Sequence, residues 1–237
     1  MIKGIFHAGS GLGNQLHRYV GTKVIALEKG EEHTMIAPEL FKGKDFMSLP
    51  VTPNDIKYEI KMPSGEVVPE SYEGVVDREF QGIQDFGAEL DRISEWLKVE
   101  PLELPDDLCV IAFRGGEYVG VPELFLPQEY WDKAIRIVRN ANFDQIKFHV
   151  VTDDVETAKK FFPNFPISHE ISMDWRMIRY AKNLILSNSS FSIFPALLGN
   201  AEMIIAPKYW ARYNTKEWIN LDNATYKKFT YIHHHED

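Results

Sequence analysis

Four short segments of the sequence combine glycines, charged side chains and hydroxyls, which are the groups that bind anions. They are residues 9–15 (GSGLGNQ), 114–118 (RGGEY), 152–154 (TDD) and 187–192 (SNSSFS). Backbone N–H groups at glycine turns and helix N-termini attract phosphates, and arginine binds them through two parallel hydrogen bonds. Taken together, these residue types favour a ligand that carries phosphate.

The first segment predicts a glycine turn that opens a helix. Gly11 and Gly13 would let the backbone approach an anion closely, and Asn14 is a favoured N-cap residue. The spacing is not G-x-G-x-x-G, because Asn14 stands where the third glycine would fall. A dinucleotide is therefore only weakly indicated, and a purely structural turn is the alternative interpretation.

The second segment places an arginine at the end of a predicted buried strand. Ligands bind at the carboxyl ends of strands in parallel α/β sheets, so we expect Arg114 to grip a phosphate there. The two glycines that follow would permit close approach of the ligand. Glu117 and Asp174 are candidates for the group that accepts a proton. The alternative is an arginine paired with a surface carboxylate.

The third and fourth segments each allow a binding role and a capping role. Asp153 and Asp154 suit recognition of a base or ribose, binding of a divalent metal, or capping of the helix that follows. We expect base or ribose recognition rather than a metal. Ser189, Ser190 and Phe191 begin a predicted helix, where hydroxyls and amides bind an anion or cap the helix.

The elements that position these segments alternate between strands and helices. Such alternation predicts a parallel sheet with helices on both faces, so the four segments are expected at one sheet edge. Residues 1–105 form the expected N-terminal subdomain and residues 106–237 a Rossmann-like C-terminal subdomain. The expected strands are residues 2–8, 56–62, 108–114, 146–152, 184–187 and 203–206, and the expected helices are residues 14–29, 86–97, 127–140, 154–162, 174–182 and 190–199.

Composition excludes several classes of protein. The net charge of −9 argues against non-specific binding to nucleic acid or to an anionic membrane surface. The sequence has no apolar run of about 18 residues, so no membrane span is expected. Its single cysteine, Cys109, lies in an apolar run, which predicts a buried thiol, no intrachain disulfide and a cytoplasmic location.

The four segments together resemble motifs of the α-1,2-fucosyltransferase family, glycosyltransferase family 11. Residues 11–15 (GLGNQ) look like the family's G-G-L-G-N-Q signature, residues 114–118 its H-x-R-R-G-D-Y motif, residues 152–154 its S-D-D, and residues 187–192 its A-N-S-S-F-S segment. Their order and spacing match over almost the whole chain. Ala112 stands at the family's histidine and Gly115 at its second arginine, and Glu117 replaces its aspartate.

The resemblance implies a GT-B-like fold of two Rossmann-like halves and an inverting transfer of fucose from GDP-fucose to a glycan, with no metal and no other cofactor. The N-terminal half would serve the acceptor side, and Arg114 would hold the donor's β-phosphate. The implied catalytic residues are Arg114, Asn14 and Glu117, and the implied donor-binding residues are Gly11, Gly13, Asn14, Arg114, Asp153, Asp154, Ser189, Ser190 and Phe191.

Two other functions remain open. The altered arginine motif fits a nucleotide-sugar- or glycan-binding protein that keeps the fold without catalysis. The first glycine segment alone would fit a dinucleotide-dependent oxidoreductase.

Overall fold

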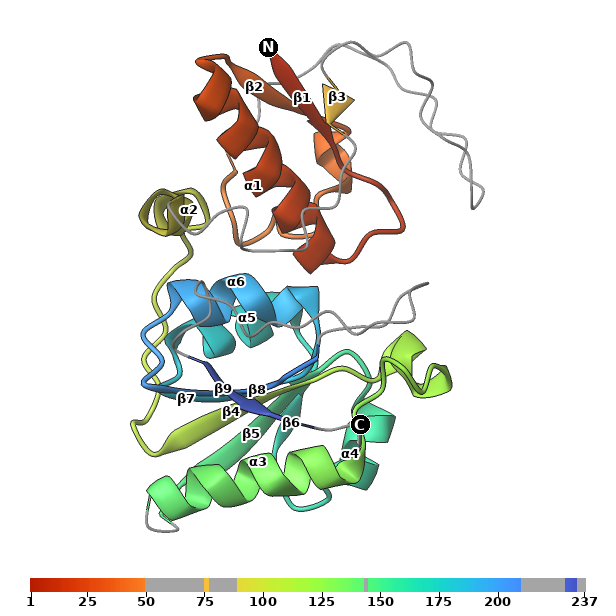
Figure 1. Ribbon diagram of the computed structural model, residues 1–237, viewed down its shortest axis with the longest axis vertical. Coiled ribbons are helices and arrows are strands. Elements are labelled where there is room, and N and C mark those ends of the chain that lie inside the picture. The colour runs from red at the N-terminus through yellow and green to blue at the C-terminus, as the bar shows by residue number, and fades with distance from the viewer. Residues whose placement is uncertain (50–74, 77–88, 143–144, 210–228, 234–237) are drawn as a thin grey trace. The chain divides into compact units, whose positions relative to one another are not determined.

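A computed structural model of the 237-residue chain describes residues 1–49, 75–76, 89–142, 145–209 and 229–233 (Figure 1). The chain divides into two compact units, unit 1 (Met1–Val99) and unit 2 (Glu100–Asp237). The strand expected at residues 56–62 lies outside the described residues.

Unit 1 is built on a small parallel sheet with the strand order β2-β1-β3. Its elements are β1 (Ile2–Ile5), α1 (Leu12–Lys29), β2 (His33–Ile36), the 3-10 turn η1 (Pro38–Leu40), β3 (Val75–Val76) and α2 (Leu90–Trp96). Helix α1 ends at Gly30, whose positive φ of 64° lets its N–H reach the carbonyl of Leu27. Glycine tolerates this left-handed conformation without strain, which explains why the helix stops where the sequence predicted.

Unit 2 is a six-stranded parallel sheet with the order β6-β5-β4-β7-β8-β9. Counted within the unit, that order is 3-2-1-4-5-6, the doubly wound arrangement of Rossmann-like folds. The elements are β4 (Leu108–Phe113), η4 (Gly116–Gly120), α3 (Gln128–Ala141), β5 (Lys147–Thr152), α4 (Val155–Phe161), β6 (Ile167–Ser168), α5 (Ile171–Tyr180), β7 (Asn183–Leu186), α6 (Ser190–Leu198), β8 (Met203–Pro207) and β9 (Phe229–Ile232).

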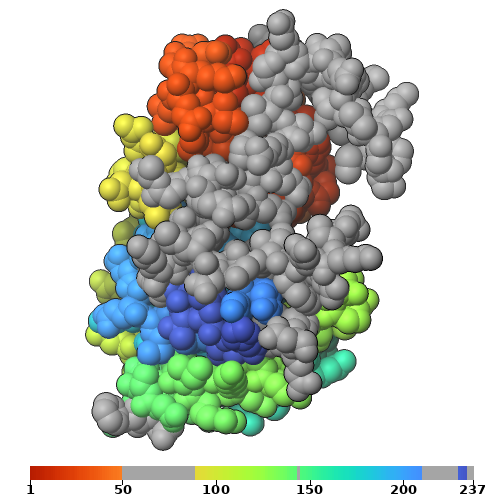
Figure 2. Space-filling view, in the orientation of Figure 1, coloured from red at the N-terminus to blue at the C-terminus, as the bar shows by residue number. Residues whose placement is uncertain are grey.

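Helices cover both faces of this sheet, α5 and α6 on one and α3 and α4 on the other (Figure 1). The central strands are therefore apolar along their whole length, as the buried run from Cys109 to Phe113 illustrates. Phe113 packs against Trp131 of α3, with the ring centroids 5.3 Å apart. The Tyr130 hydroxyl donates to the Leu186 carbonyl at 2.6 Å, tying α3 to β7. The outer side of α3 faces solvent (Figure 2).

The structure confirms the predicted parallel α/β architecture in the second half and adds two strands. Strand β6 is only two residues long and β9 follows a long connection, so neither gave a periodic signal. Helix α5 begins at Ile171, three residues before its predicted start, because Glu170 caps it through the N–H groups of Ser172 and Met173. Cys109 is buried and free, and burial raises the pKa of its thiol.

Candidate functional site

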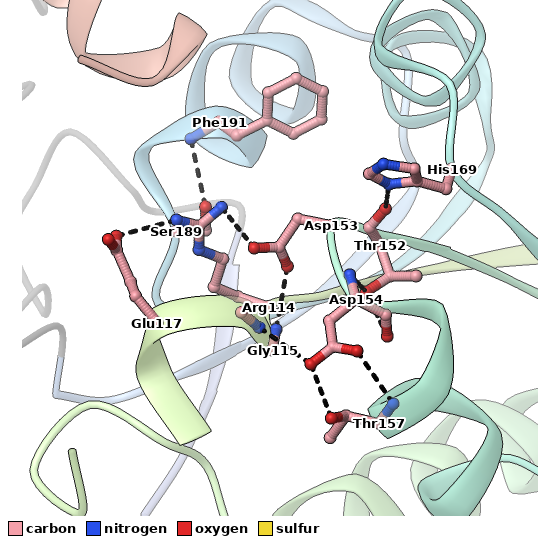
Figure 3. A network of polar contacts seen from close by, with 11 residues as sticks. Arg114, Gly115, Glu117, Thr152, Asp153, Asp154, Thr157, His169, Ser189 and Phe191 are labelled. Atoms are coloured by element: carbon pink, nitrogen blue, oxygen red, sulfur yellow. Dashed lines mark hydrogen bonds and ion pairs between the residues drawn. The ribbon is translucent and has the colours of Figure 1, made fainter. Parts of the chain in front are cut away.

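Three neighbouring strands of unit 2 bring polar segments together at the carboxyl edge of the sheet (Figure 3). Phe113 pairs with Thr152 in the register of β4 and β5, so Arg114 and Asp153 emerge side by side. The Ser187 N–H donates to the Ala112 carbonyl at 2.9 Å, which brings the end of β7 against β4 on its other side. The order in which successive strands are added to the sheet reverses between β4 and β7. Doubly wound folds bind ligands at such a switch point.

Arg114 is held by two carboxylates. Its Nη1 lies 2.7 Å from Asp153 Oδ2, and its Nη2 donates to Glu117 Oε1 at 2.9 Å. The guanidinium carbon also lies 5.2 Å from the centre of the Tyr118 ring. The Arg114 side chain is 29% exposed and that of Glu117 is 75% exposed. The ion pair between Arg114 and Glu117 is therefore exposed to solvent and contributes little to stability. An anionic ligand can therefore replace Glu117 on this guanidinium at small cost.

The two glycines after Arg114, where the sequence predicted close approach of a ligand, make room for two aspartates of the protein. The Gly115 N–H donates to Asp153 Oδ1 at 3.0 Å, and the Gly116 N–H donates to Asp154 Oδ2 at 3.2 Å. A Cβ on Gly115 would lie 2.7 Å from the Cβ of Asp154, and one on Gly116 would collide with Asp153 Oδ2. Gly116 also has a φ of 44°. Both amides already have anionic acceptors inside the protein.

Asp154 performs the capping role that the sequence left open. Its Oδ1 accepts from the Thr157 N–H at 3.0 Å and its Oδ2 from the Thr157 hydroxyl at 2.6 Å, which fixes the start of α4. These hydrogen bonds hold the pKa of the Asp154 carboxyl below its usual value. Asp153, in contrast, binds the Arg114 guanidinium and the Gly115 N–H (Figure 3). Within the described residues, no cluster of three or more His, Cys, Asp or Glu side chains could hold a metal ion.

The fourth segment caps α6 at the switch point. The Ser189 hydroxyl accepts from the Phe191 N–H at 3.4 Å, and Ser190 is the first residue of the helix. Sequence reasoning did not select Ser187 and Asn188, although they belong to the same motif. Ser187 Oγ and Asn188 Oδ1 are buried and, within the described residues, have no hydrogen-bond partner. Buried polar atoms of this kind are suited to a polar ligand, because leaving them unpaired is unfavourable.

The first glycine segment belongs to a different sheet. It follows β1 in unit 1, whereas Arg114 follows β4 in unit 2, so the expectation that all four segments share one sheet edge is wrong. Gly11 occupies the N-cap of α1 and makes no side-chain cap, since it has none to offer. Gly13 and Asn14 therefore lie within the first turn, and Asn14 is not the N-cap that was predicted.

The last residue of that segment has a structural role that the sequence did not reveal. Gln15 is buried, and its Nε2 donates to the Leu40 carbonyl at 2.8 Å. Its Oε1 accepts from the Lys42 N–H at 2.9 Å. Gln15 thus fastens the connection after η1 to helix α1, entirely within unit 1.

A histidine that the sequence reasoning passed over lies beyond Asp153 at the same edge. His169 follows β6, and its Nδ1 donates to the Thr152 carbonyl at 2.7 Å (Figure 3). A carbonyl oxygen only accepts, so the proton of the neutral imidazole is on Nδ1 and Nε2 is an acceptor. No periodic pattern or motif marks this residue, which is positioned by a two-residue strand.

Asp174, a candidate proton acceptor in the sequence, is buried beneath the surface and supports this corner through hydrogen bonds. It is only 4% exposed, and its two oxygens accept from the Ser168 hydroxyl at 2.6 Å and the Glu170 N–H at 3.0 Å. Burial raises the pKa of Asp174 to about 6. His149 Nε2, 3.0 Å from the Ser168 hydroxyl oxygen, completes the chain of contacts.

A comparison with known proteins shows a partial likeness. No family model matches the sequence. None of the helices in the described ranges combines the length and the apolar character needed to cross a membrane. The chain is 28% identical over 128 residues to the O-antigen biosynthesis glycosyltransferase WbnK of Escherichia coli. The likeness covers 48% of this chain and 42% of that protein, so the chain spans less than half of its relative. Over that part of its length, the chain is similar to a glycosyltransferase with which it shares a detectable sequence relationship.

Proposed function

We propose that the chain is a glycosyltransferase that moves fucose from GDP-fucose to a glycan acceptor with inversion and without a metal ion. The observation that carries the proposal is the position of Arg114, a cation at the switch point of a doubly wound parallel sheet. The partial similarity to a glycosyltransferase and the resemblance of the four motifs support the same class of reaction. Unit 2 would bind the donor and unit 1 would serve the acceptor.

In this proposal the donor diphosphate exchanges partners with the carboxylates on Arg114. The diphosphate replaces Glu117 and Asp153 on the guanidinium, and Asp153 then accepts hydrogen bonds from the donor's ribose or guanine. The amides at the start of α6, after Ser189 and Ser190, add positive potential near the phosphates.

The reaction forms one bond and breaks one. An acceptor hydroxyl oxygen attacks C1 of the sugar while the bond from C1 to the diphosphate oxygen breaks, and the acceptor's proton passes to a base. Negative charge grows on the leaving diphosphate, where Arg114 stabilises it. Glu117, exposed and released from Arg114 by the donor, is the carboxylate we assign to accept the proton.

A binding protein without catalysis is the second candidate. Gly115 stands at the position of the family's second arginine, and its amide is already bound to Asp153. One fewer cation at the diphosphate would weaken stabilisation of the leaving group more than binding of the donor. Tight binding of GDP-fucose with neither transfer nor hydrolysis would favour this candidate.

The first test measures thermal stabilisation by GDP, GDP-fucose, GDP-mannose, UDP and NAD, each with and without Mg²⁺. A ligand at about 100 times its Kd should add about 2.7 kcal/mol to the free energy of unfolding. We expect a shift with the guanosine compounds alone, independent of Mg²⁺, and its loss in Arg114→Ala. Arg136→Ala is the matched control, because Arg136 is an exposed arginine on α3. A shift with NAD but none with GDP would instead indicate an oxidoreductase.

A further inference from the structure

Large apolar side chains are exposed in unit 2 only near its carboxyl edge, among the residues that the structure describes. They are Val119, Val121, Ile171 and Met173. The two valines follow β4, whereas Ile171 and Met173 lie in the first turn of α5, directly after β6. Ile171 is 44% exposed and Met173 is 39% exposed. Ligand sites combine apolar surface with a few fixed polar groups, and this edge offers both.

The polar group at the β6 side is the imidazole of His169, which is held through Nδ1 and whose two sequence neighbours are also fixed. His169 donates from Nδ1 to the Thr152 carbonyl, and the residues before and after it are both bound to one buried carboxylate. That carboxylate, Asp174, accepts from the Ser168 hydroxyl and from the Glu170 N–H. His169 is itself exposed, so the fold fixes the direction of a ring whose Nε2 still accepts a hydrogen bond.

The order of the strands at the carboxyl edge suggests which part of a nucleotide lies at the end of each strand. Phosphates in doubly wound sheets lie at the switch point, here between β4 and β7, where Arg114 and the start of α6 are found. The carboxylate at the end of the next strand binds ribose in such folds, and Asp153 directly follows β5. One strand further on is β6, whose corner carries His169 and the apolar first turn of α5. Figure 3 shows Asp153 between Arg114 and His169, in agreement with this order.

We propose that the β6–α5 corner, formed by His169, Ile171 and Met173, is the subsite for the base of a bound nucleoside diphosphate. The inference rests on the proposed function, because it takes the ligand of this edge to be a nucleotide. The apolar side chains contact the faces of the base, and His169 Nε2 accepts an N–H from its edge. Guanine presents N–H donors on that edge, and Asp153 is a second acceptor near it.

The experiment compares GDP with inorganic pyrophosphate, which has the phosphates but no base. Affinities of both are measured by calorimetry for the full chain and for three variants. Ile171→Ser with Met173→Ser removes apolar surface without adding charge. His169→Asn keeps a donor near the place of Nδ1 and removes Nε2 and the ring. Val119→Ser with Val121→Ser is the matched control, because it removes two exposed apolar side chains at the β4 side of the same edge.

We expect the first two variants to lose about tenfold or more in affinity for GDP while their affinity for pyrophosphate stays within about twofold. The control should bind both probes as the unaltered protein does. Equal losses for GDP and pyrophosphate, no loss for GDP, or a loss confined to the control would each overturn the subsite while leaving nucleotide binding intact. Failure of the unaltered protein to bind any nucleotide would overturn the proposed function and this inference with it.

Discussion

Two glycine-rich turns after parallel strands look alike in the sequence and differ in what fills them. The turn before α1 in unit 1 has Gly11 at the N-cap, no side-chain cap and no acidic residue in the first turn of its helix. A Cβ on Gly11 would meet nothing within 4 Å. The turn after β4 in unit 2 is packed against Asp153 and Asp154, whose carboxylates accept from both of its glycine amides.

Glycine therefore has two opposite uses in turns that follow parallel strands. In unit 1 it leaves open space beside the start of an 18-residue helix. In unit 2 glycine allows two carboxylates to approach the backbone. They accept hydrogen bonds from the two glycine amides, and Asp153 also forms an ion pair with Arg114. An anion that enters unit 2 must therefore take Arg114 from its internal partners.

Replacement of Arg114 should have the largest effect. Arg114→Ala removes the cation that we assign to the leaving diphosphate, and loss of such a group lowers the transfer rate about 100- to 1000-fold. The measurement is kcat for sugar transfer from GDP-fucose, with Arg136→Ala as the control. Unchanged kinetics in Arg114→Ala would contradict the assignment, and would make the turn after β4 a structural feature alone.

The turn after β6 is filled in the same way as the turn after β4. The Glu170 N–H in this turn donates to the carboxylate of Asp174. The folded-state pKa of about 6 lies above the ordinary value of 3.8, so the folded protein binds more protons between these values and its stability falls as pH rises. The shift corresponds to about 3 kcal/mol between pH 4 and pH 6. Asp174→Asn should lack this part of the pH dependence in chemical denaturation.

The neighbours of Asp174 supply the control for that experiment. His149, His169 and Glu170 lie nearby in both proteins, so their contributions to the pH profile cancel in the difference. The Asn amide can donate to the Ser168 hydroxyl and accept from the Glu170 N–H, so the corner should keep its shape. Parallel pH profiles for the two proteins would contradict the role of a buried, readily protonated Asp174.

Alanine at Gly116 and at Gly11 tests the difference between the two turns directly. Gly116→Ala places a Cβ against Asp153 at a φ of 44°, and strain of this kind destabilises a protein by about 1–3 kcal/mol. Gly11 has a φ of −67° and open space around it, so Gly11→Ala should change stability by less than about 1 kcal/mol. Thermal unfolding of the two variants measures both effects. Equal effects would remove the distinction between the filled turn and the open turn.

The sequence predicted the parts of the molecule that depend on periodic burial. Apolar runs such as residues 108–113 and the amphipathic pattern of α3 identified the sheet of unit 2 and its helices. Arg114, Asp153 and Ser189 were placed at one edge because parallel strands end together. Two features depend on the pairing of strands in the folded protein, which leaves no local pattern in the sequence. Residues 11–14 follow a strand of another sheet, and His169 follows a strand of only two residues.

The smallest effect concerns Asp154, which serves the filled turn and caps α4. Asp154→Ala removes the acceptor of the Thr157 N–H, and loss of an N-cap lowers the free energy of unfolding by about 1 kcal/mol. Asp154→Ser should recover part of the loss, because serine caps helices but is too short to reach the Gly116 amide as well.

The pKa of Asp154 is lowered in the folded protein, so its contribution is present at neutral pH and is lost as pH falls through that lowered pKa. Denaturation at pH 7 and pH 3 should therefore separate Asp154→Ala from the unaltered protein more widely at pH 7. A variant as stable as the unaltered protein at neutral pH would mean that the carboxylate holds the glycine turn without fixing the helix, and the two uses of Asp154 would then be independent.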